Sequence, residues 1–167
     1  MIQFNNTMRV LQNYGALFAQ TYRDNNAAAG YDPSSELNNI SFNVTSSGGT
    51  FQLIFHLPEY WKYAENGRGP GKMPPKGSLL KWMEWKHILP TLTQIKTGPR
   101  AGKTYLPSME GLEYVIRRKI GRDGTEGSHT WELTEHELYD RLVRDVKSAL
   151  QEDIENYFMQ SNPMRKH

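Results

Sequence analysis

The sequence predicts an α+β fold, with long N- and C-terminal helices packed on a small antiparallel sheet that carries extended assembly loops. Apolar residues recur at helical spacing near both ends of the chain, and two alternating stretches between them flank a glycine-rich turn. With 167 residues, the chain is long enough to bury a core as one domain. We therefore expect a single domain over residues 1–160 and a flexible C-terminal tail over residues 161–167.

The first helix is predicted over residues 6–24, with one of the polar residues 5–7 as its N-cap. Fraying is expected after residue 26, because Gly30 and Pro33 break the pattern. Its apolar face would consist of Met8, Leu11, Gly15, Phe18 and Tyr22.

A β-hairpin is predicted next. Apolar residues alternate with polar ones over residues 40–44 and again over 51–55, and the sequence Ser-Ser-Gly-Gly at 46–49 suits a tight turn. Such alternation means that one face is buried, so we expect a helix to pack there.

The middle of the chain is irregular. A short helix is predicted over residues 78–88, with Ser78 as its cap and Leu79, Trp82 and Met83 facing inward, and Pro90 ends it. Residues 91–106 contain the breaker cluster Gly-Pro-Arg-Ala-Gly, which favours an extended arm or an irregular hairpin.

Two further helices are predicted towards the C-terminus. Ser108 is expected to cap a helix that runs to about Lys119 and is stopped by Gly121 and Gly124. The sequence Thr-Glu-His-Glu at 134–137 fits a capping box, so we expect the final helix to run from there to about residue 157. Its apolar stripe would consist of Leu138, Leu142, Val146, Ala149, Ile154 and Phe158.

The segment 60–86 combines aromatic, basic, glycine and proline residues. Because glycine permits unusual backbone angles and proline restricts them, residues 60–75 are interpreted as a shaped loop. Polar shaped loops carry contacts more often than core packing, so this loop is expected to meet a partner.

Charge is unevenly distributed along the chain. Residues 61–103 hold 9 basic and 2 acidic side chains, whereas residues 123–167 hold 5 basic and 10 acidic ones. A basic middle and an acidic end indicate head-to-tail pairing of subunits or a basic face towards nucleic acid, and a solvated mixed surface is the simpler alternative.

No motif in the sequence supports catalysis or cofactor binding. Gly-Lys-Thr at 102–104 ends like a phosphate loop, but Thr97 replaces the first glycine and Pro107 would interrupt the required helix. The histidines lack metal-ligand spacing, and no Gly-x-Ser-x-Gly motif occurs. We expect no catalytic, cofactor or metal site, and a protein that is not an enzyme.

The chain contains no cysteine, which excludes disulfides and thiolate metal sites. It has no apolar run of membrane-spanning length and no apolar core of a signal peptide at its start, so a soluble intracellular protein without membrane contact is expected.

Nucleic-acid binding is the alternative function. Basic and aromatic side chains interleave over residues 60–86, as in proteins that bind single strands through phosphate contacts and base stacking. These residues are Lys62, Arg68, Lys72, Lys76, Lys81 and Lys86, with Tyr60, Trp61, Tyr63, Trp82 and Trp85.

The pattern Tyr-x-x-Tyr-x-Glu-x-Gly at residues 60–67 leads to Met73-Pro74-Pro75 and a predicted short helix. Following a long helix and a hairpin, it resembles the neck or tail-completion proteins of tailed bacteriophages. Residues 114–125 are similar to the arginine-rich helix and Gly-Thr loop of versions from phages of Bacteroides-like hosts. The order of elements agrees over about residues 1–160, while the arm and the final helix are longer than in compact members, which leaves the ring position open.

The resemblance implies a structural virion protein of the neck or tail region, made in the host cytoplasm. Such subunits form a homo-oligomeric ring as a head-to-tail connector, tail terminator or tail-completion protein, contact neighbouring portal, neck or tail proteins, and can face channel DNA. Residues 60–75 and 97–105 would be assembly loops, and residues 135–158 a scaffold and docking face. The candidate interaction residues are Tyr60, Trp61, Tyr63, Arg68, Lys72, Met73, Pro74, Arg100 and Lys103.

Overall fold

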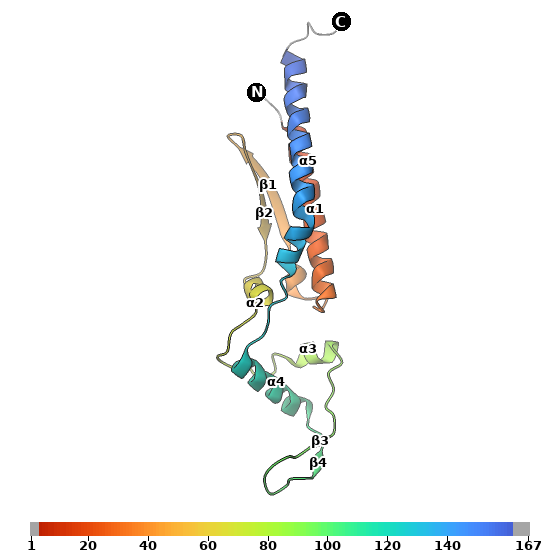
Figure 1. Cartoon of the computed structure of the whole chain (residues 1–167), viewed down its shortest axis with the longest axis vertical. Helices are drawn as coiled ribbons and strands as arrows, with labels where there is room; N and C mark the ends of the chain where they lie inside the picture. Colours follow the sequence, from red (N-terminus) through yellow and green to blue (C-terminus); the bar gives the residue numbers. More distant parts are fainter. Residues whose placement is uncertain (1–3, 162–167) are drawn as a thin grey trace. The chain divides into compact units, whose positions relative to one another are not determined.

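The computed structural model describes residues 4–161, which form two compact units (Figure 1). Unit 1 combines the chain up to Glu65 with the chain from Ser128 onward. Unit 2 is the intervening segment Asn66–Gly127. Long terminal helices and a two-stranded antiparallel sheet in unit 1 confirm the predicted α+β class.

Unit 1 is built from two long antiparallel helices and one hairpin. Its elements are α1 (Asn5–Ala28), the 3-10 helix η1 (Glu36–Asn38), β1 (Ser41–Ser47), β2 (Thr50–His56), α2 (Trp61–Asn66, whose last residue opens unit 2) and α5 (Thr130–Ser161). Helix α1 lies against α5 and contacts both strands of the hairpin, so it forms the centre of the unit (Figure 1).

The hairpin has the predicted geometry. Ser47 pairs with Thr50, so the turn consists of Gly48 and Gly49, which have φ angles of 58° and 82°. Positive φ at both central residues is what a twisted two-residue hairpin turn requires. Burial alternates along both strands, which places one face against α1.

Aromatic side chains fill the core of unit 1. The Trp131 ring lies 4.7 Å from Phe18, 5.5 Å from Phe55 and 5.8 Å from Trp61, measured between ring centroids. The buried cluster around it consists of Tyr14, Phe18, Ala19, Tyr22, Ile40 and Leu138.

Gly15 allows the close approach of α1 to the hairpin. A Cβ atom at this position would lie 2.4 Å from Cδ2 of Phe42.

Burial raises the pKa of Tyr22 above its ordinary value, which is consistent with a role in packing.

Asp153 of α5 caps the start of α1. Its Oδ1 accepts a hydrogen bond from the backbone N–H of Asn6 at 3.0 Å, and its Oδ2 accepts from the N–H of Thr7 at 2.9 Å and from the Thr7 hydroxyl at 2.8 Å. The expectation that one of residues 5–7 caps this helix is wrong, since all three lie inside its first turn. The helix also continues to Ala28 instead of fraying after residue 26.

The Asp153 side chain is only 3% exposed, and burial by itself raises the pKa of a carboxyl group. The hydrogen bonds from Thr7 and Asn6 outweigh this effect and hold the pKa of Asp153 below its ordinary value. The carboxylate therefore stays ionised at the positive end of the α1 dipole.

A second buried carboxylate caps α5. The two carboxylate oxygens of Glu65, at the end of α2, accept hydrogen bonds from the N–H groups of Trp131 at 2.9 Å and Glu132 at 3.0 Å. The predicted capping box at 134–137 is wrong, because α5 begins at Thr130. Thr134 is buried within the helix, and its hydroxyl donates to the Thr130 carbonyl at 2.7 Å.

Helix α5 extends past the start of α1. Since Asp153 lies opposite the first turn of α1, the last eight residues of α5, about two turns, continue beyond that turn. Phe158 is 65% exposed for this reason, although the sequence pattern predicted that it belongs to the buried stripe.

Unit 2 contains two short helices and a small hairpin. These are α3 (Leu80–Trp85), β3 (Thr93–Gln94), β4 (Thr104–Tyr105) and α4 (Met109–Asp123). The antiparallel pairing of β3 with β4 confirms the irregular hairpin expected over residues 91–106.

The predicted ends of α3 and α4 need correction. Ser78 does not cap α3, because its hydroxyl donates to the Pro75 carbonyl at 2.7 Å, and Trp82 is exposed whereas Met83 is fully buried. Ser108 does cap α4 through the N–H of Gly111. The helix runs through Gly121 and stops only at Gly124.

The single domain predicted over residues 1–160 stays a prediction, since two compact units on one chain can unfold together or separately. The C-terminal tail lies mostly outside the described residues, and Ser161 is the last residue of α5.

We expect Asp153→Ala to lower the free energy of unfolding by about 2 kcal/mol at neutral pH, because it removes the acceptor of the buried N–H and hydroxyl of Thr7 and of the partly buried N–H of Asn6. Glu152→Ala, one residue earlier on an exposed position, is the matched control and should have little effect. Urea unfolding measures both variants.

The difference in unfolding free energy between the native protein and Asp153→Ala should depend on pH, and this dependence tests whether the Asp153 carboxylate acts as a charged cap. Because the folded-state pKa of Asp153 is lowered, its stabilisation is complete above the unfolded pKa of about 3.9 and is lost as the pH falls through the folded value. The gap between the native protein and Asp153→Ala should therefore narrow in acid. An equal gap at every pH would contradict this assignment.

Unit 1 should fold without unit 2. The N–H of Ser128 donates to the Ala64 carbonyl at 2.8 Å and that of His129 to the Glu65 carbonyl at 3.2 Å, so the ends of the insertion lie side by side. We expect a chain in which a short Gly-Ser linker replaces Asn66–Gly127 to unfold cooperatively in urea, monitored by the fluorescence of Trp61 and Trp131. Loss of the cooperative transition would support one indivisible domain.

Candidate interaction surfaces

The predicted interaction residues are divided between the two units. Tyr60, Trp61 and Tyr63 lie in unit 1 at α2, whereas Arg68, Lys72, Met73, Pro74, Arg100 and Lys103 lie in unit 2. Residues 60–75 are therefore not one loop as predicted, because Trp61–Asn66 is helical. Trp61 packs on Trp131, while Tyr63 is exposed on the other side of α2.

Residues 66–75 of the predicted loop belong to unit 2. They are hydrogen-bonded to α4 and to the residues after it. Arg68 and Thr125 exchange two backbone hydrogen bonds of 2.8 Å, and the N–H of Gly71 donates to the Gly121 carbonyl at 2.8 Å. Arg117 of α4 donates to the Pro74 carbonyl at 2.7 Å.

Side chains in this segment complete the same arrangement. The guanidinium of Arg68 donates to the carbonyl oxygen of Lys72, and a Cβ atom at Gly121 would lie 2.8 Å from Cγ of Met73. Arg68, Met73 and Pro74 thus have structural contacts that the sequence did not reveal, which leaves Lys72 as the exposed residue of this group.

Gly67 is required by the close approach of two backbones. It has a φ angle of 75°, and a Cβ atom there would lie 2.3 Å from the Thr125 carbonyl oxygen and 2.6 Å from the Gly127 nitrogen. Both clashes involve backbone atoms, which cannot rotate away.

The arm, defined as residues 89–106, ends in a turn that presents cations. Arg100 and Lys103 are exposed, and their backbone groups make the turn: the N–H of Lys103 donates to the Arg100 carbonyl at 3.1 Å. The arm contains Lys96, Arg100 and Lys103 and no acidic residue. Its large apolar side chains Leu89, Leu92, Tyr105 and Leu106 are also exposed.

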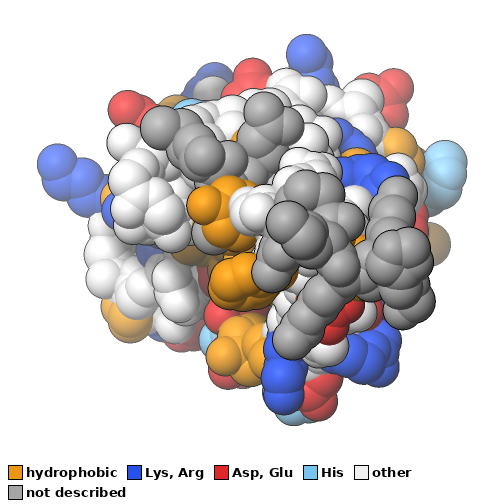
Figure 2. Space-filling view, turned by 90° about the horizontal axis from the view of Figure 1, so that it is seen from above, with side chains coloured by type: hydrophobic (Ala, Val, Ile, Leu, Met, Phe, Trp, Pro, Cys, Tyr) orange, Lys and Arg blue, Asp and Glu red, His pale blue; other side chains and the backbone are white. Residues whose placement is uncertain are grey.

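An open apolar groove of about 800 Å³ lies on unit 1, beside α5. We call the groove the surface formed by Leu11, Phe51, Leu142, Val143, Val146, Lys147, Leu150, Gln151, Ile154 and Glu155. Eight of these residues belong to α5, within the segment 135–158 expected to be a docking face, and Leu11 of α1 and Phe51 of β2 complete the surface. Viewed towards the end at which α5 finishes, hydrophobic side chains reach the surface among charged ones (Figure 2).

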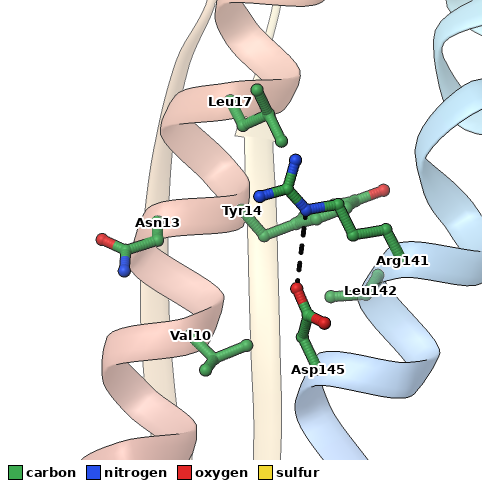
Figure 3. Close-up of a pocket in the computed structure, with 7 residues that line it drawn as sticks. All are labelled: Val10, Asn13, Tyr14, Leu17, Arg141, Leu142 and Asp145. Atoms are coloured by element: carbon green, nitrogen blue, oxygen red, sulfur yellow. Dashed lines mark ion pairs between the residues drawn. The ribbon is translucent and has the colours of Figure 1, made fainter.

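A smaller cavity of about 200 Å³ lies at the contact between α1 and α5. Figure 3 shows Tyr14 reaching from α1 towards α5, and Arg141 and Asp145 of α5 joined by an ion pair of 3.5 Å. Ligand pockets for small molecules usually measure about 300–1,000 Å³. This cavity is therefore a gap at a helix contact, lined on the α5 side by an exposed ion pair within that helix.

The two units carry opposite net charges. Unit 2 has 12 Lys and Arg and 5 Asp and Glu residues, a formal charge of +7, whereas the rest of the chain has 8 and 13, a charge of -5. The charge separation predicted from sequence therefore follows the boundary between the compact units.

Neither metal sites nor membrane spans were found in the described part of the chain. Residues 4–161 contain no group of three or more His, Cys, Asp or Glu side chains placed to hold a metal ion. Over the same residues, no helix is both long and apolar enough to cross a membrane.

No protein-family model, curated protein or solved structure matches this chain.

We expect Gly67→Ala to destabilise unit 2 by more than about 1 kcal/mol, because the alanine would have a strained φ angle and its Cβ would meet backbone atoms. Gly69→Ala is the matched control, since its Cβ would enter open space. Hydrogen exchange at the amides of Arg68 and Thr125 reports the effect. Similar exchange in both variants would contradict the close approach.

Proposed function

We propose that this protein is a structural subunit that assembles into a ring in the neck of a tailed bacteriophage, joins the portal to the tail and catalyses no reaction. The observation that carries the proposal is the opposite charge of its two compact units, +7 for Asn66–Gly127 and -5 for the remainder. The motifs of residues 60–75 and 114–125 supply the link to phage neck proteins, and the exposed apolar side chains supply surfaces for neighbours.

Opposite charges on one chain favour ring geometry for a physical reason. In a ring, each subunit presents one surface to the neighbour before it and a different surface to the neighbour after it. A positive unit facing a negative unit satisfies this at every contact of a ring, and it would also fit a two-fold dimer that pairs unlike units reciprocally. Only contacts between like units bring like charges together.

The exposed apolar side chains support an assembling protein. Leu89, Leu92 and Leu106 of the arm and Phe158 and Met159 of α5 are all more than 60% exposed. Single exposed apolar residues are ordinary, but groups of them at a projecting hairpin and at a helix end are typical of interaction sites.

Nucleic-acid binding is the second candidate, favoured by the same charge of unit 2. Trp82 is 43% exposed, and the ammonium group of Lys86 lies 4.6 Å from the centroid of the Trp85 ring. The exposed indole ring of Trp82 could stack on a base, and the neighbouring lysines could neutralise phosphates. This function would use the basic and aromatic residues of segment 60–86 and would not require assembly.

We predict that the purified protein forms a large closed oligomer at about 0.1 M salt and that the oligomer weakens at about 1 M salt, where the screening length falls from about 10 Å to about 3 Å. Light scattering measures the mass at each concentration. A monomer at both concentrations would contradict self-assembly.

A DNA-binding measurement separates the two functions. If the monomer binds single-stranded DNA and its affinity falls with rising salt, nucleic-acid binding accounts for the basic unit better than a ring does.

A further inference from the structure

The groove on unit 1 offers an apolar surface whose own charged residues, Lys147 and Glu155, balance each other. Its walls are formed largely by Leu, Val, Ile and Phe, and Val143 and Ile154 are 48% and 40% exposed. Helix α5, which supplies most of the wall, carries 8 acidic and 3 basic residues. Burial of apolar surface would drive docking, and the net charge of -5 on α5 as a whole would attract a positive partner.

The α5 helix of a second copy is not such a partner. Two copies of α5 side by side would pair surfaces that each carry a net charge of -5, so repulsion opposes the contact. The occupant must come from a surface of opposite charge.

The arm has the required chemistry. It carries three cations and no anion, and Leu92 and Leu106 are 75% and 62% exposed. These leucines stand one position beyond the paired residues Thr93 and Tyr105 on the two strands, so the antiparallel register places them opposite each other. Opposite residues in such a register point to the same face of the hairpin, so the two leucines form one apolar surface.

The arm also has little structure of its own to hold it. Its strands β3 and β4 are two residues long each, and all four of these residues are exposed. An isolated two-stranded hairpin is marginally stable in water, and strands this short bury almost nothing. Docking on another surface would bury the leucines and order the arm.

We propose that the arm of one copy docks in the groove of a second copy, with Leu92 and Leu106 against the apolar wall and the arm cations facing the acidic α5. This inference rests on the proposed ring assembly and specifies the contact that builds it. Since the arm belongs to the positive unit and the groove to the negative one, each copy offers one of each, and the contact can repeat from copy to copy.

Cysteine cross-linking of the full chain tests the contact, because the natural sequence contains no cysteine. One preparation carries Leu92→Cys and a second, of different tagged mass, carries Val143→Cys. Both positions are exposed enough to accept the change. After mixing and mild oxidation, we expect a disulfide-linked product containing one chain of each mass.

The matched control places the groove cysteine on the other side of α5. Glu152 is exposed and lines a separate hollow with Asn6 and Arg9, so Glu152→Cys has similar access but a different location. We expect about tenfold more product with Val143→Cys, because docking raises the local concentration of the two thiols. Equal yields would overturn the proposal.

Three other outcomes would also overturn it. Dominant products between two Val143→Cys chains would show that α5 pairs with itself. A disulfide within one chain that carries both Leu92→Cys and Val143→Cys, without products between chains, would show that the arm occupies its own groove. If no disulfide-linked product contains Val143→Cys, the arm does not dock in the groove.

Light scattering of the same samples separates this inference from the proposed function. If the protein forms a large oligomer but the arm and groove do not cross-link, the ring assembly stands and only this contact is wrong. If the protein is a monomer throughout, both fail together.

Discussion

The carboxylate of Asp153 fixes how the two longest helices lie together. It satisfies the first N–H groups of α1 from a position near the end of α5, so it sets the offset of one helix along the other. Most of what is distinctive in unit 1 depends on that offset. The aromatic core forms where α1, α5 and the hairpin meet, and the last turns of α5 extend beyond α1 with Phe158 and Met159 exposed.

Glu65 caps the start of α5 in the same way that Asp153 caps α1, and it also connects the two parts of unit 1. It lies on α2, directly before the inserted unit, and binds the N–H groups of Trp131 and Glu132 directly after it. Because both ends of the insertion are held at one point of unit 1, the scaffold can carry unit 2 without a change in its own core. Unit 2, with its net charge of +7, is thus connected to the negatively charged unit 1 by two adjacent chain segments.

Local signals in the sequence predicted several local structures, although the cap at Ser78 was wrong and helix α2 was not expected. The Gly48-Gly49 turn, the cap at Ser108 and the hairpin arm all depend on residues within a few positions of one another. The capping of α1 and α5 could not be predicted, because each cap comes from a carboxylate 65 or more residues away. Eight of the ten groove residues lie within residues 135–158, the segment expected to be a scaffold and docking face, whereas the contributions of Leu11 and Phe51 could not be predicted because they come from distant elements. Arg68 and Pro74 were predicted to contact partners. In the structure, the Arg68 guanidinium donates to the Lys72 carbonyl within the same loop, and the Pro74 carbonyl accepts a hydrogen bond from Arg117 of α4.

In the proposed assembly, unlike surfaces of identical chains meet in a repeating, closed arrangement. Electron microscopy of the purified protein at low salt tests it most directly, because averaged images reveal the symmetry of the particles. We expect rings with a single cyclic symmetry, in which every contact is equivalent. Two-fold dimers joined through the same surface on both chains, or monomers alone, would contradict it.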